Sequence, residues 1–217
     1  MSTLPASSEQ RVVLKSVSWE TYLALTEGSE SSSGRITYDR GVLEIMSPGM
    51  PHEIAKRLIG RMIETFTLCR GIEIRSSSST TFKRMELQRG FEADESYYIQ
   101  HASELRGVGE IDLSIHPPPD LVLEVDMTNS SIPKKGLFAA MKIPEVWRYD
   151  GESLWMVSLY QDGYQDLEQS LVLPAFPREL ASRLLDRQVE ENETALMRIF
   201  LDSLLGERQN GVSQPEA

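Results

Sequence analysis

The segment PPDLVLEVDMT, residues 118–128, constrains the fold more than any other part of the sequence. Its apolar run has the length of a buried strand, and successive side chains of a strand point to opposite faces. One face is then apolar and the other acidic: Leu121, Leu123 and Val125 against Asp120, Val122, Glu124 and Asp126. Burying an acid is costly unless it is paired or binds a metal. The segment therefore predicts a central strand in which Glu124 has either a functional role or a structural ion pair.

The remaining pattern predicts a mixed sheet flanked by helices. Apolar residues at helical spacing predict a helix capped by Ser18, a long helix over 52–69, a helix over 133–142, and one or two helices within 178–205. Short β-rich runs predict strands at 35–47, interrupted by a turn, and at 72–77, 80–85, 95–100, 120–126, 145–150 and 153–160. This order indicates an α/β (α+β) layered fold.

The chain of 217 residues is long enough for one domain with a substantial core, and it contains no dividing linker. We expect a single domain over residues 18–205. The polar start of the chain indicates a flexible segment over residues 1–17, and the polar end indicates a disordered tail over residues 206–217.

Charge and cysteine content restrict the partners and the compartment. The net charge of -11 lowers the expectation of nucleic-acid binding, because phosphate contacts normally use a surplus of Lys and Arg. The single cysteine excludes an internal disulfide framework and fits a reducing compartment. No apolar run is long enough to span a membrane, and no secretory leader precedes the first helix. We therefore expect a cytoplasmic protein without a membrane partner.

The spacing of the acids decides which of them can share a metal ion. Asp120 and Glu124 lie four residues apart on one strand, so their Cα atoms are roughly 13 Å apart. A partner for Glu124 is therefore expected on a neighbouring strand, where paired side chains approach closely. The best candidate is Asp94, which immediately precedes an aromatic strand, and Asp126 is a further candidate on the strand face of Glu124.

Four ordered blocks of the sequence resemble a known family. They are YDRGVLEIMSPGMPHE, GFEADESYYI, PPDLVLEVDMTNSS and KIPEVWRYDG, and they resemble successive blocks of the Uma-two family of bacterial restriction-endonuclease-like proteins over residues 18–205. The resemblance implies the PD-(D/E)xK nuclease fold, a mixed β-sheet flanked by helices with two acids and a lysine around a divalent metal.

Carried over to this chain, the resemblance places the metal-binding acids at Asp94 and Glu124, with Mg²⁺ or Mn²⁺ as the cofactor. The usual lysine position, two residues after the second acid, is Asp126 here. The family pattern instead indicates a lysine four residues before Phe138, which is Lys134. Lys135 is the neighbouring alternative. Ala93 stands where the family usually has proline.

Two more residues are candidates for a supporting role in the site. His52 begins the long helix at a position where the family blocks have a histidine, and the alternative is a capping or core histidine. Glu44 lies on the preceding strand and would face the same cleft unless it is exposed to solvent.

The sequence therefore predicts a Mg²⁺-dependent nuclease that hydrolyses phosphodiester bonds of nucleic acid, with DNA as the expected substrate. Two alternatives remain: a catalytically inactive binding or regulatory protein that keeps the fold, and a metal-dependent hydrolase of another substrate. We also expect a homodimer, because apolar residues recur at helical spacing near the chain end. These residues are Leu196, Ile199, Phe200 and Leu204.

Overall fold

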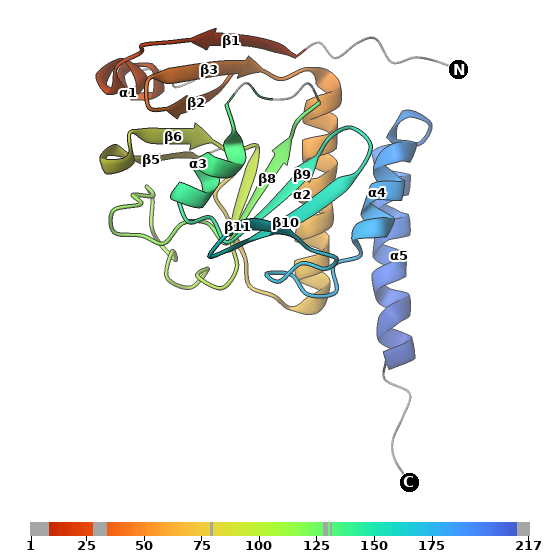
Figure 1. Cartoon of the computed structure of the whole chain (residues 1–217). Coiled ribbons are helices and arrows are strands. Elements are labelled where there is room, and N and C mark those ends of the chain that lie inside the picture. Colours follow the sequence, from red (N-terminus) through yellow and green to blue (C-terminus); the bar gives the residue numbers. More distant parts are fainter. Residues whose placement is uncertain (1–8, 28–33, 79, 128–129, 131, 212–217) are drawn as a thin grey trace.

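The computed structural model describes residues 9–27, 34–78, 80–127, 130 and 132–211, and within these ranges the strands form two sheets with helices around them (Figure 1). The first sheet has the order β1-β3-β2-β6-β5 and the second has the order β11-β10-β9-β8-β7-β4. The first consists of β1 (Gln10–Leu14), β2 (Arg35–Asp39), β3 (Val42–Ser47), β5 (Thr81–Arg84) and β6 (Arg89–Glu92). The second consists of β4 (Arg75–Ser76), β7 (Glu95–Tyr98), β8 (Leu121–Val125), β9 (Glu145–Tyr149), β10 (Leu154–Tyr160) and β11 (Gly163–Asp166).

The helices are α1 (Trp19–Glu27), α2 (Met50–Arg70), α3 (Lys134–Ala140), α4 (Arg178–Asp186) and α5 (Glu193–Gly211), with short 3₁₀ turns η1 (Met85–Leu87) and η2 (Arg187–Val189). Strands β8 and β9 run parallel, whereas the other neighbours in the second sheet are antiparallel. Helix α3 connects these two parallel strands, as a crossover between parallel strands requires. The predicted mixed α/β architecture is confirmed.

Local sequence signals explain where the predicted helices begin and end. The Ser18 side chain accepts a hydrogen bond from the backbone N–H of Thr21 at 3.2 Å, which caps the start of α1. Helix α2 ends at Gly71, whose φ of 68° is left-handed and favours glycine. No helix within the described residue ranges is long and apolar enough to cross a membrane.

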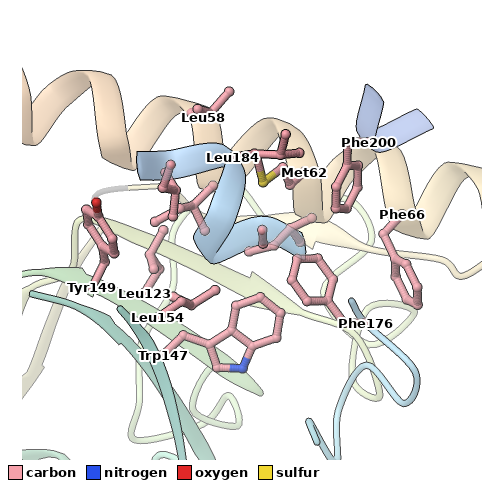
Figure 2. Close-up of a cluster of buried hydrophobic side chains, with 14 of the residues drawn as sticks. Leu58, Met62, Phe66, Leu123, Trp147, Tyr149, Leu154, Phe176, Leu184 and Phe200 are labelled. Carbon is pink, nitrogen blue, oxygen red and sulfur yellow. The ribbon is translucent and has the colours of Figure 1, made fainter. Parts of the chain in front are cut away.

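Strand β8 has two differently covered faces. Leu121, Leu123 and Val125 belong to a large apolar cluster that includes residues of α2, α4 and α5 (Figure 2). Val122, on the opposite face, belongs to a second cluster together with Phe138 of α3. The predicted alternation is therefore correct, but the acidic face of the strand is covered and not open to solvent.

The structure differs from expectation at both ends of the chain and in two strands. Residues 10–14, which we expected to be flexible, form β1 and pair with β3. This edge strand is mostly exposed, so its sequence shows no alternation. Strands β6 and β11 were also missed, and helix α5 continues to Gly211, into the expected disordered tail. Residues 212–217 of that tail lie outside the described residues.

The apolar stripe of α5 packs within the chain. Leu196, Phe200 and Leu204 are fully buried in the large cluster, and Ile199 packs against it. Figure 1 shows α5 alongside α4 and α2. The stripe that we expected to join two copies is thus used inside one copy, and it no longer supports a homodimer.

We predict that Leu184→Ala lowers the free energy of unfolding by about 2–5 kcal/mol, because it removes a buried side chain and leaves a cavity. Leu184 of α4 is 0% exposed in the large cluster (Figure 2). The matched control is Leu68→Ala in α2, where the side chain is 82% exposed and the expected change is within about 0.5 kcal/mol. Urea unfolding followed by circular dichroism measures both, and equal losses would contradict the assigned core.

Candidate functional site

Glu124 and Lys134 form a largely buried ion pair at the centre of the candidate site, with side-chain exposures of 4% and 15%. Glu124 lies in β8 and is 3% exposed, and its Oε2 accepts a hydrogen bond from the Lys134 ammonium at the start of α3. The other carboxylate oxygen, Oε1, has no hydrogen-bond partner among the described residues. Glu124 thus has one oxygen neutralised by lysine and one buried oxygen with unused acceptor capacity.

Asp94 lies beside Glu124 on the neighbouring strand. The register pairs Glu95 of β7 with Leu123 of β8, so the preceding residue, Asp94, comes opposite Glu124. Asp94 Oδ2 accepts the backbone N–H of Val125 at 2.8 Å, which holds the carboxylate against β8. The structure therefore brings together the two acids that the sequence predicted as metal ligands.

The acids on either side of Asp94 point elsewhere. Glu92 accepts hydrogen bonds from the Ile36 N–H and the Thr81 hydroxyl in the first sheet. Burial raises the pKa of Glu95, and charged residues of α2, including Lys56, act on it electrostatically. Of the acid-rich run EADE, only Asp94 joins Glu124 and Lys134.

Burial and neighbouring charges perturb all three groups. Burial raises the pKa of Glu124 to about 7, because the attraction of Lys134 offsets only part of the burial cost and the Asp94 carboxylate adds repulsion. Burial alone would lower the pKa of Lys134, but the carboxylates around it raise the pKa above its usual value. Burial would raise the pKa of Asp94, but His52 and Lys134 lower it. Lys134 is therefore an ammonium at neutral pH.

His52 lies between two carboxylates and is buried at the start of α2. Its Nε2 lies 2.9 Å from Asp94 Oδ1, and its Nδ1 lies 2.7 Å from Glu9 Oε1. Burial would lower the pKa of His52, but hydrogen bonds to Asp94 and Glu9 raise it to about 9. His52 is thus an imidazolium that orients Asp94. The sequence had left open whether His52 is a site residue or a capping or core histidine.

Arg11 of β1 neutralises a second group of acids. Its guanidinium bonds to Glu44 at 2.9 Å and to Asp126 at 3.1 Å, and it lies 3.5 Å from Glu9. Glu44 is 1% exposed, so the alternative that it is exposed to solvent is wrong. The second oxygen of Asp126 pairs with Arg148 at 3.2 Å. Asp126 therefore lies near Glu124, but both of its oxygens are already engaged by arginines.

Sequence reasoning missed Glu9, Arg11 and Arg35 as members of this site. Arg35 of β2 approaches Asp94 Oδ1 at 3.5 Å. These residues contact the site from the first sheet, through strands that are distant in sequence. A short β-branched run at residues 10–14 was the available signal for β1.

Asp120 lies at the other end of β8 and has a local role. Its carboxylate accepts backbone N–H bonds from Ile99 and His101 and also contacts the His101 ring at 2.6 Å. This geometry agrees with the expectation that Asp120 stands apart from the site. Lys135, the neighbouring alternative to Lys134, is exposed.

A cavity of about 550 Å³ opens at Glu124 and Lys134 and continues along β9, β10 and β11. Ile132, Phe138, Val146 and Val157 are apolar lining residues, and Lys135 and Arg148 add basic groups. The buried charges therefore lie at one end of a larger recess.

Comparisons with known proteins agree with this architecture. A family model described as "Uma2: Putative restriction endonuclease" matches residues 19–189. No curated protein gives a significant match. Among solved structures, the chain is similar to one titled "Crystal structure of a putative nuclease belonging to DUF820" from Anabaena variabilis, with 15% sequence identity and a TM-score of 0.52. This likeness covers 75% of the present chain and 92% of that chain, and the predicted restriction-endonuclease-like fold is confirmed.

We predict that His52→Ala lowers the free energy of unfolding by about 3–5 kcal/mol, because it leaves Glu9 and Asp94 as buried carboxylates without their shared cation. The measurement is urea unfolding in buffer containing EDTA. The control is His101→Ala: its ring is half-exposed, and Asp120 keeps two backbone N–H bonds, so we expect a loss of about 1 kcal/mol. Equal losses in the two variants would show that His52 does not hold the charges together.

Proposed function

The chain belongs to the Uma2 family, and from this premise we propose that it is a metal-dependent nuclease that hydrolyses phosphodiester bonds of nucleic acid, with DNA as the expected substrate. The observation that carries the proposal is the set of buried Asp94 and Glu124 with the part-buried Lys134, of which Glu124 and Lys134 line an open cavity. Two carboxylates can hold a divalent cation, and that cation and the ammonium would stabilise the negative charge that a phosphodiester gains in the transition state.

The residues present fit a hard divalent cation. Mg²⁺ and Mn²⁺ prefer oxygen ligands, and Mg²⁺ usually binds one or two protein carboxylates and keeps several waters. Glu124 offers its buried Oε1, and the Asp94 oxygens accept few enough bonds to retain acceptor capacity. Among the described residues no group of three or more His, Cys, Asp or Glu side chains forms a fuller metal cage. Asp94 and Glu124 would therefore hold the ion together with water.

Each protein residue then has a distinct role. A divalent ion bound there supplies Lewis-acid polarisation of the phosphodiester and a more acidic water. The Lys134 ammonium stabilises negative charge on the phosphate. His52 and Arg35 hold the Asp94 carboxylate in place. Arg11 and Arg148 neutralise Asp126, which limits repulsion of the anionic substrate.

The alternative is a binding or regulatory protein that keeps this fold without catalysis. The net charge of -11 and the presence of Asp126 at the usual lysine position favour it. A homodimer also remains a proposal. The remaining argument for a homodimer is that its two active sites could cleave the two strands of a duplex.

We predict that Lys134→Met reduces the cleavage rate at least ~100-fold, because it removes a preorganised positive charge from the reacting phosphate. The assay uses plasmid and single-stranded substrates with Mg²⁺ or Mn²⁺, and circular dichroism checks folding. The matched control is Lys135→Met, which lies next along α3 but is exposed and should be mild. Similar rates for the two variants, or a larger loss in Lys135→Met, would show that the lysine assignment is wrong.

We further predict that Glu124→Gln abolishes cleavage and weakens Mn²⁺ binding measured by calorimetry, because it removes a charged oxygen ligand without changing side-chain size. Asp120→Asn is the control, since Asp120 lies at the opposite end of the same strand and bonds only to the 99–101 turn among the described residues. This control should retain cleavage and metal affinity. A wild type that is inactive with both metals, and indistinguishable from Glu124→Gln, would support the non-catalytic alternative.

A further inference from the structure

The cavity extends well beyond the residues that hydrolysis requires. Glu124 and Lys134 line only one end of its volume of about 550 Å³. The rest is lined by side chains of β9, β10 and β11, including Trp155 and Tyr164. We call this second part the β10 recess, defined by Phe138, Val146, Trp155, Val157 and Tyr164.

The strand register aligns the β10 recess with the charged end of the cavity. Glu124 of β8 pairs with Arg148 of β9, and Arg148 pairs with Trp155 of β10. Residues paired in register project from the same face of a sheet, so these three side chains form one row across it. Two strand spacings place the Trp155 backbone roughly 10 Å from that of Glu124. A ligand bound at Glu124 could therefore extend within the same cavity to Trp155.

Trp155 is the exposed tryptophan of the chain and is held in a defined orientation. Its side chain is 49% exposed, whereas Trp19 is 6% and Trp147 0% exposed. The indole N–H donates a hydrogen bond to Asp150 Oδ2 at 2.9 Å. A single exposed aromatic residue is common on protein surfaces. Here, however, the ring is tethered, lines a cavity and lies in register with buried charges, which fits a stacking surface.

The charges around the recess favour a neutral group over further phosphates. Asp150 and Asp166 line the cavity near Trp155, and the chain as a whole carries a net charge of -11. Long duplexes are bound through many phosphate contacts, which need a basic surface. A nucleobase is uncharged, has an apolar face for stacking, and often carries an amino group that can donate a hydrogen bond to a carboxylate.

We propose that the β10 recess binds an unpaired nucleobase, stacked on Trp155, while the adjoining phosphodiester lies at Glu124 and Lys134. The substrate class is then single-stranded or locally unpaired nucleic acid, since a paired base cannot leave the helix without the cost of unstacking. The placement of the phosphodiester rests on the proposed nuclease function, whereas base binding itself does not.

The first test is binding without catalysis, in buffer containing EDTA. Tryptophan fluorescence should be quenched when a short single-stranded oligonucleotide, of DNA or RNA, is added. The quenching reports on Trp155, because Trp19 and Trp147 are buried. The same strand annealed to its complement should quench much less. By fluorescence anisotropy of a labelled strand, Trp155→Ala should bind about tenfold or more weakly, and Trp155→Phe should bind nearly as wild type because it keeps an aromatic face.

The control variant is Tyr160→Ala, another exposed aromatic residue of β10, 44% exposed and outside the cavity lining. It should bind the single strand as wild type does. Absence of quenching, equal quenching by the duplex, or wild-type affinity in Trp155→Ala would overturn the proposal.

Cleavage assays separate this proposal from the proposed nuclease function. If the wild type cleaves nucleic acid and Trp155→Ala cleaves single strands at the same rate, the base site is wrong and the nuclease proposal stands. If no metal supports cleavage but Trp155-dependent quenching is present, the base site stands and the nuclease proposal fails.

Discussion

The pairing of Lys134 with Glu124 is the interaction on which the candidate site depends. A carboxylate in the middle of a buried strand requires a cation, and Lys134 supplies it from the first turn of α3. The lysine reaches this position because Leu137 and Phe138 are buried on the same side of α3 and fix that helix against the second sheet. The packing of one short helix thereby sets both the charge and the geometry at Glu124.

A second layer of charge balance comes from the first sheet. Arg11 of β1 pairs with Glu44 and Asp126, while Glu9, just before β1, shares His52 with Asp94. These contacts link the edge strand β1 with α2 and with the end of β8. Because Asp126 is neutralised on both oxygens, Asp94 and Glu124 remain the carboxylates best suited to a ligand. The preorganisation of the site thus depends on residues outside the three that define the chemistry.

The distribution of charge reconciles an acidic protein with the proposed anionic substrate. Lys134, Lys135 and Arg148 line the cavity together with four acids, so its positive charge is confined to these three side chains and is not spread over a surface. Such an arrangement suits a ligand that presents few phosphates at a time. Together with the tethered Trp155, it supports the proposed binding of a nucleotide strand over that of a long duplex face.

The sequence by itself determined the elements whose signals are local. Alternation over residues 120–126 identified the two faces of β8, helical spacing identified α2 and α3, and strand length separated Asp120 from Glu124. The assignment of Lys134, four residues before Phe138, as the site lysine came from the family resemblance. Phe138 is buried against the second sheet, on the same side of α3.

Only the tertiary structure decided which distant groups meet. It held Asp94 against β8, buried Glu44 against Arg11, placed β1 in a sheet, and turned the α5 stripe inward. These outcomes depend on register and packing between segments far apart in the chain, which leave no periodic signal in either segment. Hydrophobic periodicity reports which face of an element is buried, but it does not report what that face is buried against.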